Sequence, residues 1–110
     1  HIIYAGADFL LMPSRVEPCG LNQMYALRYG TVPVVNAIGG LKDTVIDIEN
    51  KGFGICHNKV SVADVTNSIQ RATSFYKNTK KFLNNSKKIM TIDHSWDNSA
   101  QEYINVYKNL

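Results

Sequence analysis

Two short apolar runs without polar alternation restrict the fold of this chain most. Phe9–Met12 is closed by Pro13, and Val32–Val35 follows about twenty residues later. Such runs are typical of strands buried on both faces, as in a parallel sheet. The apolar segment Leu21–Tyr29 between them predicts a largely buried helix. Strand, helix and strand in this order predict a parallel βαβ unit.

The later segments extend this pattern. Leu41–Ile48 is expected to form a short helix or turn, and Phe53–Cys56 a third strand. Ser61 and Asp64 have capping-box spacing at a helix start. Helices are expected over 62–76, 79–90 and 96–110. The fold class is therefore α/β, part of a doubly wound parallel-sheet, Rossmann-like domain with a helical C-terminus.

Composition limits the classes of function. With 110 residues and a net charge of +3, the chain suits one small domain without a marked preference for a partner. Cys19 and Cys56 provide no disulfide framework, and no apolar run is long enough for a membrane span. A late lysine cluster could bind a polyanion, but a solvated helix face is favoured, so neither nucleic acid nor membrane is expected as a partner. The cluster consists of Lys77, Lys80, Lys81, Lys87 and Lys88.

The two loops that follow the first two strands are the candidate site. Pro13–Gly20 and Asn36–Gly40 leave the carboxyl ends of neighbouring strands, so they are expected to share one crevice. The first loop leads into a helix start, where free N–H groups and the helix dipole favour an anion. Glu17 is the carboxylate in this loop, and Gly20 allows a ligand close to the backbone. This chemistry suits a ligand that is part sugar and part phosphate.

Three motifs in order carry a resemblance to a known family: SRVEPCGLNQMYALRYGTVPVV, GGLKDTV and SWDNSAQEY. Together they resemble the C-terminal part of bacterial glycogen synthases and plant starch synthases, which are retaining glucosyltransferases of the GT-B architecture. A GT-B enzyme has two Rossmann-like domains with the active site between them. The resemblance implies that residues 1–110 are a partial C-terminal nucleotide-sugar-binding domain and that the N-terminal domain of the same chain is missing. Such a fragment is expected to be inactive alone, to bind donor weakly at best, and to have an unpaired sheet edge.

The resemblance also implies the reaction. Glucose would be transferred from ADP-glucose, or from UDP-glucose, to the non-reducing end of an α-glucan with retention of configuration. The leaving diphosphate would assist the incoming hydroxyl, so no second acid is required. No cofactor or metal ion is expected. The location would be the bacterial cytoplasm, or a plastid if the source is plant-like.

Residue roles follow from the same resemblance. Glu17 matches the glutamate that contacts donor glucose and helps the oxocarbenium-like transition state to form, through a fixed negative charge. Cys19 and Gly20 would offer backbone contacts to glucose hydroxyls, and the amides of Leu21 and Asn22 would face the distal phosphate. Donor-binding roles are also assigned to Arg15, Gly39 and Gly40.

Other interpretations of these residues remain open. A loop glutamate such as Glu17 is most often simply solvated. Arg15 could bind phosphate or pair with Glu17, and Cys19 could be a nucleophile, although no activating partner is evident. Ile38 stands where relatives commonly have Thr.

Three further features of the sequence have a structural and a functional interpretation. Asp43 and Asp47 could share a helix face and bind a metal, although surface carboxylates are the default. The second glutamate of many retaining GT-B enzymes is replaced by Tyr25, which supports the narrower family. The aromatic stripe of the last helix is expected to pack before it binds sugar; it includes Trp96, Tyr103 and Tyr107.

Alternative functions are another GT-B nucleotide-sugar transferase, with a different nucleotide or acceptor, and a non-catalytic nucleotide- or carbohydrate-binding module. Retention of Glu17 disfavours the binding module.

Overall fold

Three parallel strands form the centre of the molecule. The computed structural model describes residues 1–110 and places β1 (Phe9–Met12), β2 (Val32–Asn36) and β3 (Ile55–His57) in the order β1-β2-β3. All neighbouring strands pair in parallel, with Leu11 opposite Val34 and Val35 opposite Cys56. The predicted parallel βαβ unit is confirmed.

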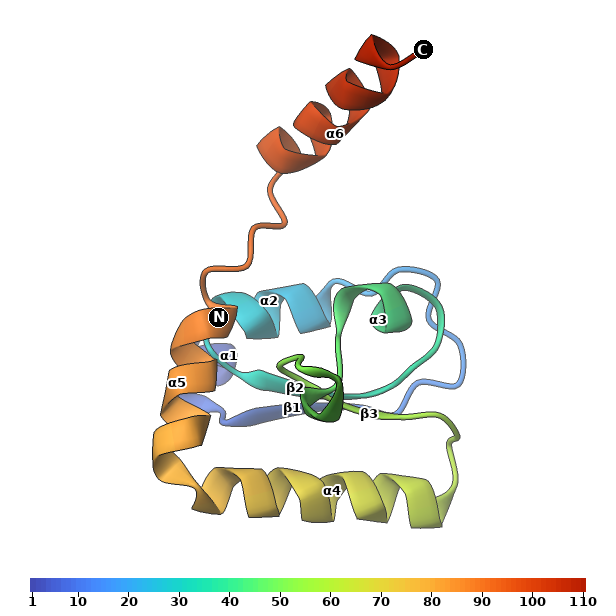
Figure 1. The fold of residues 1–110 in the computed structure, drawn as a ribbon. Coiled ribbons are helices and arrows are strands. Elements are labelled where there is room, and N and C mark those ends of the chain that lie inside the picture. The colour runs from blue at the N-terminus through green and yellow to red at the C-terminus, as the bar shows by residue number, and fades with distance from the viewer.

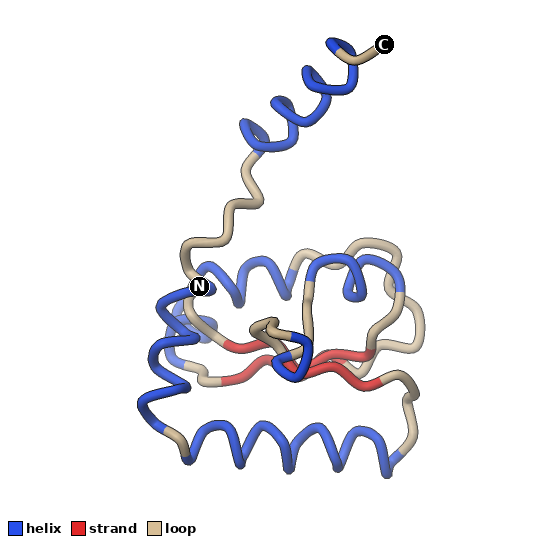
Figure 2. Tube along the Cα trace, viewed as in Figure 1, coloured by secondary structure: helices blue, strands red, loops and turns tan.

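Helices cover both faces of this sheet (Figure 1). α2 (Asn22–Arg28) and α3 (Gly39–Thr44) lie on one face, and α4 (Val62–Lys77) runs along the other. α5 (Thr79–Ile89) passes the amino ends of the strands and links the two layers, which the tube view also shows (Figure 2). The short helices α1 (Ile2–Gly6) and η1 (Ile48–Asn50) flank the sheet. None of the helices combines the length and apolar character that crossing a membrane requires.

The core forms on both sides of β2. All five residues of β2 are buried, because it is the central strand and both of its faces are covered. Pro33 is the second residue of this strand, which confirms the expectation that it lies near the strand start. The larger cluster of buried apolar residues comprises Met12, Leu27, Val32, Val35, Leu41, Val45, Phe53, Phe75, Phe82 and Ile89. The smaller one, on the α4 side, comprises Val34, Ile55 and Ala72.

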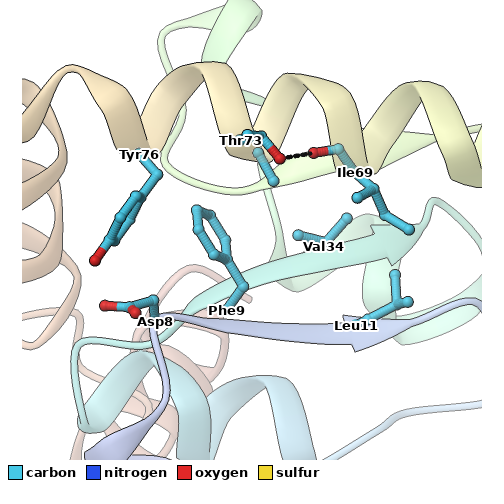
Figure 3. A pocket seen from close by; sticks show the side chains of 8 residues that line it. Asp8, Phe9, Leu11, Val34, Ile69, Thr73 and Tyr76 are labelled. Carbon is cyan, nitrogen blue, oxygen red and sulfur yellow. Dashed lines mark hydrogen bonds between the residues drawn. The ribbon is translucent and has the colours of Figure 1, made fainter.

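β1 corrects one expectation from the sequence. We expected this strand to be buried on both faces, but Leu11 is 44% exposed and only Met12 is buried. The reason is that β1 forms an edge of the sheet and one side of it lacks cover. Leu11, Val34, Ile69 and Tyr76 instead line a cavity of about 360 Å³ between the strands and α4 (Figure 3).

α4 begins as predicted but buries a different face. Ser61 caps its start by accepting a hydrogen bond from the Asp64 N–H. The expected core stripe was Val62, Val65, Ile69, Ala72 and Tyr76. The residues actually buried are Ser68, Ala72 and Phe75. Ile69 and Tyr76, which were expected in the core, instead line the cavity beside Leu11 and are about half exposed.

The last helix, α6 (Trp96–Lys108), projects away from the sheet (Figure 1). It has no buried residue, and Trp96 is 88% exposed. The predicted cap is present, since Ser95 accepts a hydrogen bond from the Asn98 N–H. The packing expected of Trp96, Tyr103 and Tyr107 does not occur within residues 1–110, because nothing in this range lies against that face.

Candidate functional site

The two candidate loops meet at the carboxyl edge of the sheet. The N–H of Gly40 donates to the carbonyl oxygens of Glu17 (3.2 Å) and Pro18 (3.1 Å). At the base of the same loop, the side-chain amide of Asn36 donates to the Ser14 carbonyl at 2.8 Å. The expectation that both loops lie together is therefore confirmed, and the contact joins main-chain carbonyls of the first loop to the Gly40 N–H and the Asn36 side chain of the second.

The glycine pair has a different setting from the one expected. Gly39 and Gly40 form the first turn of α3, whereas the sequence suggested a helix or turn starting at Leu41. Gly39 has φ of 50°, and a Cβ atom there would overlap the Glu17 carbonyl. A Cβ atom on Gly40 would overlap the backbone of Cys19. Both positions need glycine because two segments of backbone lie in direct contact.

The side chains of the first loop remain available to a ligand. Glu17 is half-buried, whereas Arg15, Cys19 and Asn22 are exposed. Both ion pairs of the structure belong to Arg71, so the suggested pair between Arg15 and Glu17 is not formed. A phosphate contact of Arg15 stays a prediction.

The start of α2 also leaves donors unused. Leu21 is the N-cap residue, and its side chain makes no cap bond. The first bond of the helical ladder runs from the Tyr25 N–H to the Leu21 carbonyl at 3.0 Å. The N–H groups of Asn22, Gln23 and Met24 precede that ladder and therefore have no partner in the helix.

Gln23 is the site residue that sequence reasoning missed. It is fully buried, and its Nε2 donates to the carbonyls of Cys19 (3.1 Å) and Gly20 (2.9 Å) and to the hydroxyl of Thr44 (3.1 Å). A glutamine in the first turn of a largely buried helix, three residues after the loop glycine, was the available signal.

The carboxyl ends of β2 and β3 carry a second buried polar pair. Asn36 and His57 lie opposite each other in register, and both are buried. Nδ1 of His57 is 3.0 Å from the Ser68 hydroxyl, while His57 Nε2 and Asn36 Oδ1 lack a partner. Burial lowers the pKa of His57, although the charge of Asp64 opposes this shift.

Asp47 belongs to a structural network and does not share a helix face with Asp43, because α3 ends at Thr44. Its carboxylate accepts hydrogen bonds from Arg71 (2.6 Å) and from the N–H groups of Glu49 (2.8 Å) and Cys56 (2.6 Å). Burial raises the pKa of Asp47, but these bonds outweigh burial, and the net pKa lies below the usual range.

The second cysteine lies beside that network. Burial, together with the Asp47 charge, raises the pKa of the Cys56 thiol to about 11. Its Sγ points to the Val45 carbonyl (3.5 Å), whereas the neighbouring His57 faces Ser68 on α4. The two residues therefore face opposite sides of the sheet, as expected from their adjacent positions. No group of three or more His, Cys, Asp and Glu residues is placed to hold a metal ion.

Comparison with known proteins identifies the family. Residues 1–89 match the family described as glycosyl transferases group 1. The chain belongs to this family. It is 56% identical over 107 residues to a glycogen synthase of Flavobacterium johnsoniae, and 47% identical over 108 residues to one of Aquifex aeolicus. These alignments cover 97% and 98% of the chain but 23% of each relative. The chain thus spans less than a quarter of the length of these relatives.

Two solved structures share the fold of this chain. The catalytic domain of starch synthase IV from Arabidopsis thaliana, bound to ADP and acarbose, superposes with a TM-score of 0.87 at 36% identity, covering 97% of the chain and 23% of that structure. Sucrose-phosphate synthase from Thermosynechococcus elongatus gives a TM-score of 0.73 at 26% identity over 98% of the chain and 26% of that structure. The resemblance to glycogen and starch synthases and the Rossmann-like part of a GT-B domain are confirmed. The roles of individual site residues stay predictions.

Proposed function

We propose that this chain is the donor-binding part of an α-1,4-glucan synthase, which transfers glucose from a nucleotide sugar to the non-reducing end of a glucan. The observation that carries the proposal is the setting of Glu17. Its carboxylate lies half-buried in a loop at the carboxyl edge of a parallel sheet, where ligands of such folds bind. The backbone of this loop is fixed by α3. The similarity to glycogen synthases makes glucose transfer the chemistry that best fits this carboxylate.

In the proposed mechanism, Glu17 acts through its charge. Positive charge develops on the glucose ring as the bond to the diphosphate breaks, and a carboxylate at a fixed distance lowers the energy of that state. Configuration is retained because the leaving diphosphate assists the incoming hydroxyl on the same face of the sugar. The residue eight positions later is Tyr25, so the scheme requires no second carboxylate from this helix.

Donor recognition is assigned mostly to main-chain groups. The backbone of Cys19 and Gly20 would contact glucose hydroxyls, and the amides of Leu21 and Asn22 would face the distal phosphate. Arg15 is exposed and makes no ion pair, which is consistent with a contact to phosphate. Gly39 and Gly40 would border the donor while also holding the loop through their backbone contacts.

ADP-glucose is the proposed donor, with UDP-glucose as the alternative. The starch synthase with the same fold is described as bound to ADP, and its second ligand, acarbose, is a carbohydrate. The acceptor would be an α-glucan, and the partner domain would be the N-terminal domain of the longer protein. We expect the 110 residues alone to be inactive, because they span 23% of the compared glycogen synthases. The bacterial cytoplasm, or a plastid, would be the location.

The test uses the full-length protein. Glucose incorporation into glycogen from ADP-glucose and from UDP-glucose is compared between the wild type and Glu17→Gln. We expect the variant to lose at least about two orders of magnitude in rate, the scale for removing one preorganised electrostatic group. Glu102→Gln is the matched control, because Glu102 is exposed on α6 and makes no ion pair.

Two results would contradict the proposal. A folded wild type without incorporation from either donor would favour another transferase or a non-catalytic binding module. Equal rates in the wild type and in Glu17→Gln would remove the role assigned to Glu17 while leaving the family unchanged.

A further inference from the structure

We infer that Gln23 and Thr44 form a hydrogen-bonded bridge that sets the position of the Glu17 loop, and that both are positioning residues for the transfer reaction. The inference rests on the proposed function for its kinetic consequence. The bridge itself is defined by contacts that are independent of any substrate.

The side-chain amide of Gln23 is held in one orientation. Its Nε2 has two hydrogens and lies within 3.1 Å of three acceptors, two of which are the carbonyls of Cys19 and Gly20. Carbonyl oxygens can only accept, so the nitrogen must face them and the amide cannot be reversed. A Cβ atom at position 20 would overlap Oε1 of Gln23, and Gly20 has φ of 72°, so a larger residue there would displace this amide or strain the backbone.

Thr44 extends the bridge to the other loop. Its Oγ1 donates to the Gly40 carbonyl at 2.6 Å, four residues earlier in α3, and lies 3.1 Å from Gln23 Nε2 as the third acceptor of that group, so one of the two amide hydrogens is shared between two acceptors. The Gly40 N–H in turn donates to the carbonyls of Glu17 and Pro18. A continuous path of hydrogen bonds therefore runs from α2 through α3 and back to the Glu17 loop.

As a result, four consecutive loop carbonyls are held by the scaffold. The carbonyls of Glu17 and Pro18 accept from Gly40, and those of Cys19 and Gly20 accept from Gln23. The N–H groups of Glu17, Cys19 and Gly20 have no partner in the chain. The loop is thus oriented with its carbonyls on the scaffold, and its amides and side chains remain free for the donor.

A purely packing role does not explain Gln23. The side chain is fully buried, and its Oε1 has no hydrogen-bond partner, which is unfavourable in the interior. A methionine would fill a similar volume without that cost. The hydrogen bonds that Nε2 donates to the loop carbonyls explain why an amide is present at this position. A shift of about 1 Å in a reacting group can lower a rate about 100-fold, so fixing the loop bears directly on Glu17.

The experiment uses the full-length protein with Gln23→Met, Thr44→Val and Thr44→Ser. Gln70→Met is the matched control, because Gln70 is exposed on α4. Three quantities are measured: kcat and KM for donor and acceptor, the melting temperature, and hydrogen exchange of peptides that cover residues 14–24. Assays are run well below the melting temperature of each variant.

We expect Gln23→Met and Thr44→Val to lower kcat by about 10- to 100-fold, with the acceptor KM unchanged and with faster exchange over residues 14–24. Thr44→Ser keeps the hydroxyl and should stay close to the wild type. The double variant Gln23→Met/Thr44→Val should lose little more than Gln23→Met alone, because both changes break the same path.

The inference is overturned if Gln23→Met is folded and keeps both the wild-type kcat and the wild-type exchange. It is also overturned if Thr44→Val behaves as Thr44→Ser, which decides the matter if Gln23→Met does not fold. An inactive wild type would refute the proposed function instead, and in that case faster exchange over residues 14–24 in the variants still establishes the bridge.

Discussion

The two faces of the sheet differ in how completely their residues are covered and hydrogen-bonded. On the α2 and α3 face, the loops are fixed by hydrogen bonds, and glycines let backbones touch, as at Gly39 and Glu17. On the α4 face, only part of the apolar surface is covered. Leu11 and Tyr76 remain about half exposed around a cavity (Figure 3).

The two faces differ because the Glu17 loop is held by residues close to it in the sequence, whereas the α4 side is not fully covered by residues of this chain. The hydrogen bonds that hold the Glu17 loop come from residues between Ser14 and Thr44. The open side of α4 and β1 has apolar residues that are only partly covered. The chain covers 23% of each compared glycogen synthase. Other parts of such a longer protein can cover this side.

The largest effect is expected from Gly39→Ala in the full-length protein. A Cβ atom would overlap the Glu17 carbonyl, and φ of 50° is strained for alanine, so α3 must withdraw from the loop. Glucose transfer should fall by more than about 100-fold. Gly6→Ala is the control, since no atom lies within 4 Å of a Cβ there. Retention of wild-type activity in Gly39→Ala would mean that the backbone contact is not required.

A pair of leucines compares the two faces directly. Leu27 is 1% exposed on the α2 face, and its replacement by alanine should lower the free energy of unfolding by about 2–5 kcal/mol. Leu11→Ala should cost less than about 1 kcal/mol in the 110-residue chain, because its side chain is already half exposed. Urea denaturation measures both. Equal losses would show that the open side is covered in solution, for instance by a second copy.

The ion pair between Asp47 and Arg71 lies beside β3, and Asp47→Asn tests how much it contributes to the free energy of unfolding. The substitution weakens the bonds to Arg71 and to the Cys56 N–H, and it should lower the free energy of unfolding by about 1–3 kcal/mol. Asp43→Asn is the control, since Asp43 is exposed and makes no ion pair. Chemical denaturation at pH 7 would show similar losses in both variants if the network contributes nothing.

The smallest effect is a pH dependence that arises at His57 on the α4 face. Burial lowers the pKa of this residue in the folded state, so the unfolded state binds a proton first as the pH falls. Its contribution to stability is complete above the unfolded pKa of about 6.5 and is lost progressively as the pH falls below that value. Denaturation midpoints between pH 7.5 and 5 should show this slope, and His57→Gln should flatten it. An unchanged slope in the variant would assign it to other groups.

The sequence was informative where the signal is local. The apolar runs at Phe9 and Val32 predicted strands, and Ser61 with Asp64 predicted the start of α4, because strand burial and capping depend on adjacent residues. The exposure of Leu11 could not be predicted, because it depends on strand order and not on the residue itself.

The candidate site followed the same division. The loop and its contact with the glycine pair could be predicted from the strand order. Gln23 could not be identified as a site residue, because its role depends on the position of Thr44, 21 residues later. The start of α3 was misplaced for a related reason: a Gly-Gly pair disfavours a helix locally, and contact with the Glu17 loop overrides that preference.

The four anchored carbonyls of residues 17–20 have an evolutionary consequence. Main-chain carbonyls anchor this loop, and every residue type provides them, whereas the φ of 72° at Gly20 favours glycine. Substitutions of Glu17 or Cys19 therefore leave the anchored carbonyls of the loop in place. A new loop shape would instead require coordinated changes at Gln23, Gly39 and Thr44. The backbone position of this loop is therefore more constrained in evolution than the side chains that it presents.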